Sequence, residues 1–288
     1  MKTPLGALAL TALLSTFGCA TSRAGADDAH TAAMAREHAN DSARANASAQ
    51  EPRQPVTAED VAYGELDGAP LRGYLARPAA SSGPLPALVV IHEWWGLNDN
   101  VRMMTRRLAG EGYLALAVDL YGGQSASTPE AARALMQSAT AAPERGVANL
   151  RAAATFLRDG RHAPRMGVVG WCFGGGWSLQ AALALPAQVD AAVMYYGRVE
   201  ADPARLAALD APLLGLFGGA DTGIPVEGVR QMESALRGLG RDVTIQVYEG
   251  AGHAFANPSG ERYQPAAADD AWRRTVDFFA RHLRPAGV

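Results

Sequence analysis

The sequence lacks a basic stripe and a hydrophobic run of membrane-spanning length, and it has only two cysteines, Cys19 and Cys172. The net charge is −3 and no arginine-rich stretch offers a field for phosphate backbones, so we expect no nucleic-acid partner. An apolar run at Leu5 to Leu14 is shorter than the roughly 20 residues that a transmembrane helix needs. Hydrophobic residues make up 48% of the chain and charged residues 19%, which is typical of a globular protein.

The N-terminus has the features of an export signal. Lys2 gives a basic start, the apolar run follows, and the small residues Gly18-Cys19-Ala20 come next. Residues 1–20 are therefore predicted to be a signal peptide, and the protein is expected in the periplasm or on the bacterial cell envelope. Two processing routes stay open. Lipidation of Cys19 would tether the chain to a membrane, whereas Ala24-Gly25-Ala26 would suit ordinary signal cleavage.

Residues 21–55 are rich in alanine, polar and charged residues and show no sustained apolar period. Such a segment cannot bury a face, so it is interpreted as a disordered linker. Its two histidines, His30 and His38, are expected to be solvated. The remaining residues, 56–288, are predicted to form the folded domain, with Cys172 as the lone thiol once Cys19 is lipidated or removed.

After Val56, short apolar runs alternate with amphipathic stretches, which predicts an α/β fold. A mostly parallel eight-stranded sheet with helices on both faces is expected, and the Asp67-Gly68 turn predicts an antiparallel hairpin at its edge. The expected strands are Val61–Leu66, Leu71–Ala76, Ala87–Ile91, Leu114–Val118, Met166–Gly170, Ala191–Tyr195, Pro212–Phe217 and Val243–Tyr248. The expected helices are Val101–Ala109, Pro129–Ala139, Arg145–Asp159, Gly175–Leu185, Val226–Leu239 and Ala267–Leu283.

Cys172 is the candidate nucleophile. It lies between Gly170 and Gly174, directly after an apolar strand and before a predicted helix, in the form of a nucleophile elbow. A helix N-terminus favours the thiolate, and the N–H of Phe173 would be free to bind an oxyanion. The alternative is an inert, buried cysteine.

A base and an orienting acid follow the candidate nucleophile in the chain. His253 and Asp221 each come after a predicted strand, in the order nucleophile, acid, base that is typical of this kind of site. His92 also follows a strand, but it precedes Cys172 and is expected to be a hydrogen-bonded packing residue. Asp119 is expected to anchor its own loop.

Glu93 stands beside Trp94 and Trp95, which suggest a partly closed apolar pocket. A carboxylate near a thiol raises the pKa of the thiol and would keep it protonated until substrate displaces the carboxylate. We expect no cofactor, and a metal site at His92, Glu93 and His253 is disfavoured because the spacing matches no known zinc type.

Six segments together resemble the dienelactone hydrolase family over residues 56–283. They are HEWWGLN, GYLALAVDLYGG, GWCFGGG, YYG, GGADTGIP and GAGHAFA. The resemblance implies an α/β-hydrolase fold, a triad of Cys172, Asp221 and His253, and a gating role for Glu93. It also implies an oxyanion hole from the N–H groups of Trp94 and Phe173, with Tyr121 near the pocket.

Two positions depart from the family pattern. Where family members that act on dienelactone carry arginines for its carboxylate, this chain has Gly123 and Asn257. Because arginine orients a planar carboxylate by paired hydrogen bonds, the substrate is expected to lack that group or to be held otherwise, with Arg198 as a candidate substitute. The sequence thus predicts a hydrolase of small esters, lactones or thioesters; the alternative is a catalytically silent binding protein with the same fold.

Overall fold

The computed structural model describes residues 32–34, 36–38 and 50–284. An eight-stranded sheet with the order β1-β2-β4-β3-β5-β6-β7-β8 lies at its centre. The first two strands form an antiparallel edge hairpin, β2 pairs antiparallel with β4, and the other pairs are parallel. The strands are β1 (Val56–Leu66), β2 (Ala69–Pro78), β3 (Ala87–Ile91), β4 (Leu114–Val118), β5 (Met166–Trp171), β6 (Ala191–Tyr195), β7 (Leu213–Gly218) and β8 (Val243–Tyr248).

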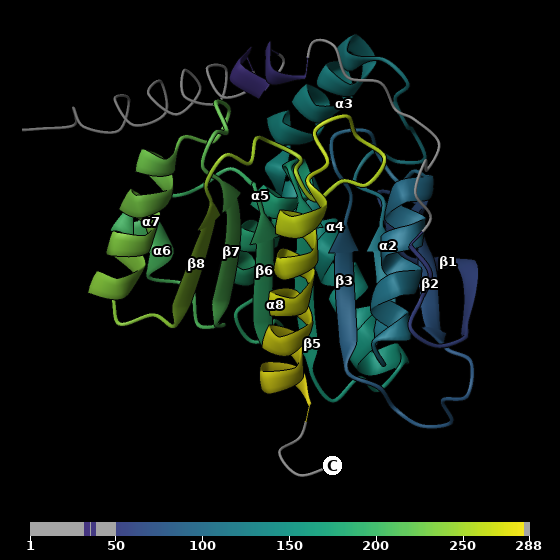
Figure 1. Ribbon diagram of the computed structural model, residues 1–288. Coiled ribbons are helices and arrows are strands. Elements are labelled where there is room, and N and C mark those ends of the chain that lie inside the picture. The colour runs from purple at the N-terminus through teal and green to yellow at the C-terminus, as the bar shows by residue number, and fades with distance from the viewer. Residues whose placement is uncertain (1–31, 35, 39–49, 285–288) are drawn as a thin grey trace, which may run out of the picture.

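Helices cover both faces of this sheet (Figure 1). The strands β3 to β7 are buried along their whole length, as continuous apolar runs in a doubly covered sheet should be. In Figure 1, α2 and α8 lie in front of the sheet, and α4 and α5 lie behind it. The helices are α2 (Asp99–Gly110), α3 (Pro129–Ala141), α4 (Pro143–Thr155), α5 (Phe173–Ala184), α6 (Pro203–Leu206), α7 (Val226–Gly238) and α8 (Pro265–Leu283).

The eight predicted strands, the edge hairpin and the six predicted helices are confirmed, with ends that differ by a few residues. Two features were not predicted. The four-residue helix α6, which the side chain of Asp202 caps, is too short to show a helical period. The predicted helix at Arg145–Asp159 also ends differently, because α4 passes into a π-helical turn at Phe156–Gly160.

The expectation of a solvated His38 is wrong. Its side chain is 2% exposed, as is that of Met34, and both belong to a helical segment at residues 32–34 and 36–38. The predicted signal peptide, Cys19, His30 and most of the expected linker lie outside the described residues. Among the residues that the structure does describe, no helix combines the length and the apolar character needed to cross a membrane.

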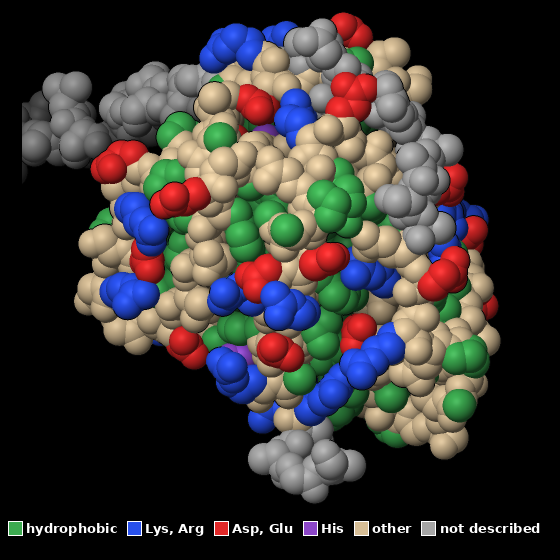
Figure 2. Space-filling view, viewed as in Figure 1, with side chains coloured by type: hydrophobic (Ala, Val, Ile, Leu, Met, Phe, Trp, Pro, Cys, Tyr) green, Lys and Arg blue, Asp and Glu red, His purple; other side chains and the backbone are tan. Residues whose placement is uncertain are grey.

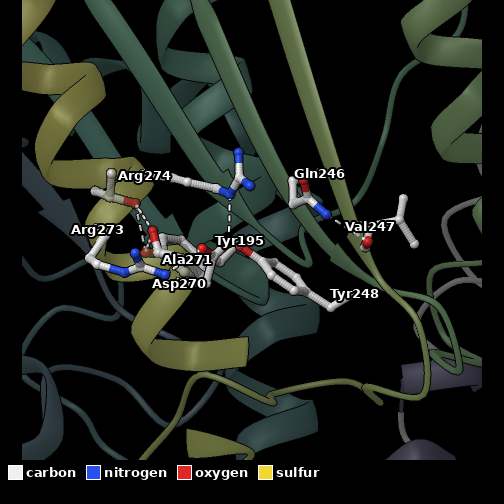
Figure 3. Close-up of polar contacts among 9 residues, drawn as sticks. Tyr195, Gln246, Val247, Tyr248, Asp270, Ala271, Arg273 and Arg274 are labelled. Atoms are coloured by element: carbon white, nitrogen blue, oxygen red, sulfur yellow. Dashed lines mark hydrogen bonds and ion pairs between the residues drawn. The ribbon is translucent and has the colours of Figure 1, made fainter. Parts of the chain in front are cut away.

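Polar contacts join the last helix, α8, to β6 and β8 (Figure 3). The Tyr195 hydroxyl donates to the carbonyl of Ala271 at 3.1 Å, and that of Tyr248 donates to Asp270 at 2.9 Å. Asp270 also pairs with Arg273 and Arg274, and Figure 2 shows acidic and basic side chains interspersed on this face. These contacts hold the N-terminal half of α8 against the sheet.

Candidate active site

Cys172 occupies the sharp turn between β5 and α5. Its backbone has φ 54° and ψ −116°, a conformation that costs free energy for a residue with a side chain. A Cβ atom on Gly170 would collide with the backbone of Gly174, and one on Gly174 would collide with the carbonyl of Ile91. The glycines therefore allow the close approach that holds Cys172 at the N-terminus of the helix.

His253 and Asp221 meet at the carboxyl ends of β8 and β7. Nδ1 of His253 lies 2.7 Å from Oδ2 of Asp221, and both side chains are fully buried. The other oxygen, Oδ1, accepts from the backbone N–H groups of Gly223 and Ile224 at 2.8 and 2.9 Å. Asp221 is thus held by its own loop while it orients the imidazole, and Nε2 of His253 is left to face the thiol.

The thiol and the imidazole favour an ion pair. Burial raises the pKa of Cys172, but the charge and hydrogen bond of His253, together with His38, lower it to about 6. Burial lowers the pKa of His253, but Cys172 and Asp221 raise it to about 10. Burial raises the pKa of Asp221, and the contacts with His253 outweigh that effect and lower it. A thiolate beside an imidazolium is the state that can attack a carbonyl carbon.

His92 is a packing residue, as predicted. Its Nε2 accepts from the N–H of Leu120 at 3.1 Å, so Nδ1 carries the proton and donates to the carbonyl of Glu93 at 2.6 Å. Asp119 anchors its own loop, since it accepts from the N–H groups of Tyr121 and Gly123. Both predictions are confirmed.

Glu93 is 5% exposed and lines the same small cavity as Cys172. Its Oε2 accepts from Nδ2 of Asn257 at 2.5 Å. Asn257, at the position where the resemblance implied an arginine, thus holds the carboxylate of Glu93. The other such position, Gly123, has φ 89° and open space around it.

Two cavities open onto Cys172. The smaller, of about 30 Å³, is lined by Glu93, Trp94, Trp95 and Asn257. The larger, of about 190 Å³, has a mixed lining that includes the apolar side chains of Met34, Met136, Val147, Trp177 and Ile224 and the polar ones of Tyr196, Arg198 and Glu200. Trp95 thus lines the smaller cavity and Arg198 the larger, and their contact with substrate stays a prediction. Tyr121 lines neither cavity and packs against His92 and Phe173.

Phe173 is the first residue of α5, where a helix leaves its N–H groups without intrahelical partners. Trp94 follows β3 closely, is 1% exposed and lies against the ring of His38 at 4.5 Å between centroids. Trp94 also lines the smaller cavity with Cys172, and the role of the two N–H groups as an oxyanion hole stays a prediction.

Sequence reasoning missed Met34 and His38. They reach the site from a segment more than 130 residues before Cys172, and the surrounding composition shows no apolar period. Their spacing of four residues, which places both on one helical face, is a signal that the sequence carries.

One group of side chains could hold a metal ion by distance alone. Ligand atoms of His38, Cys172 and His253 all lie within 4.8 Å of one another. However, Nδ1 of His38 lies 2.8 Å from Nη2 of Arg262, and a guanidinium only donates. Nδ1 must therefore accept, which leaves the proton of a neutral His38 on Nε2. Neither that proton nor the adjacent positive charge suits a cation.

Comparison with known proteins places these features in a family. The model of the dienelactone hydrolase family matches residues 71–283. A relative from Salmonella typhimurium named "Putative carboxymethylenebutenolidase" is 38% identical over 228 residues, which cover 75% of this chain and 84% of that protein.

Solved structures agree with the sequence match. The "Putative Dienelactone Hydrolase" from Klebsiella pneumoniae superposes with a TM-score of 0.72 and 32% identity, over 79% of this chain and 100% of that one. A bacterial brefeldin A esterase, at 16% identity, superposes with a TM-score of 0.62 over 96% of this chain and 89% of that one. The α/β-hydrolase fold predicted from the sequence is confirmed.

Proposed function

The chain belongs to the dienelactone hydrolase family and is a carboxylic ester hydrolase. We propose that it cleaves small esters or lactones through a catalytic triad of Cys172, His253 and Asp221. The observation that carries this proposal is the position of Cys172, strained at the start of α5 and within reach of a histidine that Asp221 orients. No cofactor enters the proposed reaction.

In this mechanism the Cys172 thiolate attacks the carbonyl carbon of the ester. The N–H groups of Trp94 and Phe173 bind the oxyanion that forms. As the carbon–oxygen bond breaks, the imidazolium of His253 gives its proton to the departing oxygen, and a thioester with Cys172 remains. His253 then takes a proton from water, the hydroxide attacks the thioester, and the thiolate leaves.

The sulfur nucleophile favours substrates with stabilised leaving groups. The tetrahedral intermediate can expel either the thiolate or the alcohol-derived oxygen, and the weaker base leaves more readily. Since the pKa of Cys172 is held at about 6, an alkoxide is a much poorer leaving group than the thiolate. Aryl esters, enol lactones and thioesters avoid this return to substrate, so they are the proposed substrate class.

The substrate is also proposed to lack the carboxylate of dienelactone, or to bind it through Arg198. This follows from Gly123 and Asn257, which offer no guanidinium, and from the contact that commits Asn257 to Glu93. Glu93 is proposed to line the pocket beside the thiolate, with Asn257 holding its carboxylate in place.

A series of acetate esters of graded phenols and alcohols tests the proposed reaction. We expect kcat/KM of the wild type to depend steeply on the pKa of the leaving group. In Cys172→Ser the dependence should be shallower, because an alkoxide nucleophile is itself a poor leaving group. Equal slopes in the two proteins, or efficient cleavage of simple alkyl esters by the wild type, would contradict a sulfur nucleophile.

We also propose that the protein is exported, with residues 1–20 as the signal and Cys19 as a candidate lipid attachment site. Cell fractionation and the mass of the mature N-terminus test this. A mature chain that begins at Cys19 with an attached lipid supports the tether, whereas cleavage beyond Cys19 supports release to the periplasm. An unprocessed chain in the cytoplasm would contradict export.

A further inference from the structure

The helical segment at residues 32–34 and 36–38 lies over the carboxyl ends of the parallel strands, above the site (Figure 1). Side chains from its two ends reach different parts of the site. Met34 lines the larger cavity, and His38 lines the smaller one beside Cys172. A segment outside the expected domain therefore supplies side chains to both cavities.

Arg262 connects this segment to the loop of His253. Its Nε donates to the carbonyl of His253 at 3.0 Å, and its Nη1 donates to the carbonyl of Glu37 at 2.7 Å. Its Nη2 donates to Nδ1 of His38 at 2.8 Å. The Thr222 hydroxyl, next to Asp221, also binds the Glu37 carboxylate. Four contacts thus fix His38 relative to the base and the acid.

The contact with Arg262 determines where the proton of His38 lies. Because Nδ1 accepts from the guanidinium, a neutral His38 carries its proton on Nε2. The ring is 2% exposed, stands edge-on to His253 with centroids 4.9 Å apart, and lies within 4.8 Å of the sulfur by its nearest ligand atom. Cys172 therefore faces two histidines with different roles, one able to exchange a proton and one fixed as a donor.

We propose that His38 is a further catalytic residue of this hydrolase, whose Nε2–H donates a hydrogen bond to the Cys172 thiolate. The proposal rests on the proposed function in so far as the thiolate is the nucleophile. The donor stabilises the resting thiolate and stabilises it again when it is expelled from the tetrahedral intermediate of thioester hydrolysis. Hydrogen bonding by His38 is also one of the causes that lower the pKa of the thiol.

The test measures the pH profile of Cys172 alkylation by iodoacetamide, which does not require hydrolysis. His253 and His38 lower the pKa of this thiol, and the other titratable groups near it are Glu93, Tyr121 and Tyr196. The variants are His38→Ala, His38→Gln, which keeps an N–H donor, and His162→Asn as a control in an exposed loop. Thermal unfolding midpoints check that each variant folds.

In His38→Ala we expect alkylation at pH 6 to slow by about tenfold, since a hydrogen bond to a charged group is worth about 1.5–3 kcal/mol. At pH 9 the rates should converge, because the thiol is then ionised in both proteins. The kcat/KM for an aryl ester should fall by about tenfold as well. His38→Gln should recover most of both losses, and His162→Asn should match the wild type.

Four results would overturn the proposal. They are an alkylation profile unchanged in His38→Ala, a His38→Gln variant no better than His38→Ala, a rise in kcat/KM when His38 is removed, and protection of the thiol by Zn²⁺ that depends on His38. A rise in kcat/KM would mean that the segment obstructs substrate access, and Zn²⁺ protection would mean that His38 is a metal ligand. If the alkylation shift appears while Cys172→Ala still hydrolyses esters, the donor role stands and the proposed triad fails.

Discussion

Two histidine–carboxylate pairs lie beyond the carboxyl ends of the strands, one after β3 and β4 and one after β7 and β8, and only the second has the geometry of a reacting centre. His92 is fully buried with Nε2 4.0 Å from Asp119, and His253 is fully buried with Nδ1 2.7 Å from Asp221. Residue type, burial and a nearby carboxylate are therefore common to both pairs.

The two histidines differ in how many of their ring nitrogens are bonded to the backbone. Loop and strand-end groups occupy both nitrogens of His92, through the N–H of Leu120 and the carbonyl of Glu93. At His253, only Nδ1 is committed, to Asp221, and Nε2 faces Cys172. A buried histidine becomes a base when its surroundings satisfy one nitrogen and leave the other toward a reactant. Variants of the two pairs should consequently fail in opposite ways.

The largest contrast is expected between the histidines. His253→Gln should lower kcat/KM for an aryl ester by about 10⁴-fold, because it removes the group that moves the proton. His92→Gln should change kcat/KM by less than about threefold, and should instead cost about 1–3 kcal/mol of unfolding free energy by leaving a buried backbone group unsatisfied. Steady-state kinetics and urea unfolding of both variants measure this. Similar losses of kcat/KM in both variants would contradict the assignment of His253 as the base and His92 as a packing residue.

Substitution of Asp221 should impair catalysis and substitution of Asp119 should impair stability, with a smaller loss of activity than for His253. Asp221→Asn should lower kcat/KM by about 10³-fold, since an amide can hold the imidazole in the wrong tautomer. Asp119→Asn should leave kcat/KM near the wild-type value and reduce the free energy of unfolding, because Asp119 accepts from the N–H groups of Tyr121 and Gly123. A stable Asp119→Asn protein that is as inactive as Asp221→Asn would assign Asp119 a catalytic role.

The pH dependence gives the smallest and most graded effect. Because the pKa of Cys172 is held at about 6, the rate of its alkylation should rise with pH through about 6 and stay level above it. Below that pH the thiolate is protonated, so the rate should fall about tenfold per pH unit. In His253→Gln the rise should move to higher pH, since the imidazolium that stabilises the thiolate is gone, whereas His92→Gln should keep the wild-type profile. A wild-type thiol that ionises only near 9 would contradict the ion pair.

The sequence predicts the sheet, the elbow and the base because each is encoded locally. An apolar run followed by Gly170 and Gly174 around Cys172 specifies a sharp strand-to-helix turn. His253 and Asp221 each follow a strand of the parallel sheet, whose ends meet at one edge.

What the sequence does not predict depends on contacts between distant segments. His38 lies in a polar stretch and is buried by residues far along the chain, because it packs against Trp94 and His253 and accepts from Arg262. The contact between Asn257 and Glu93 joins two loops 164 residues apart. The spacing of Met34 and His38 indicates a helical face, but no local motif names the partner of His38 or of Glu93, because each contact joins segments far apart in the chain.

Trapping of the acyl-enzyme tests the identity of the nucleophile most directly. An activated aryl ester is mixed with the protein, the reaction is quenched in acid within one turnover, and the tryptic peptide of residues 166–198 is sequenced by mass spectrometry, with Cys172→Ala as the control. The predicted result is one acyl group on Cys172 that disappears as product forms and is absent from the variant. Continued turnover with the acyl group on another residue, or with no adduct on Cys172 at any time, would contradict a cysteine nucleophile in this hydrolase.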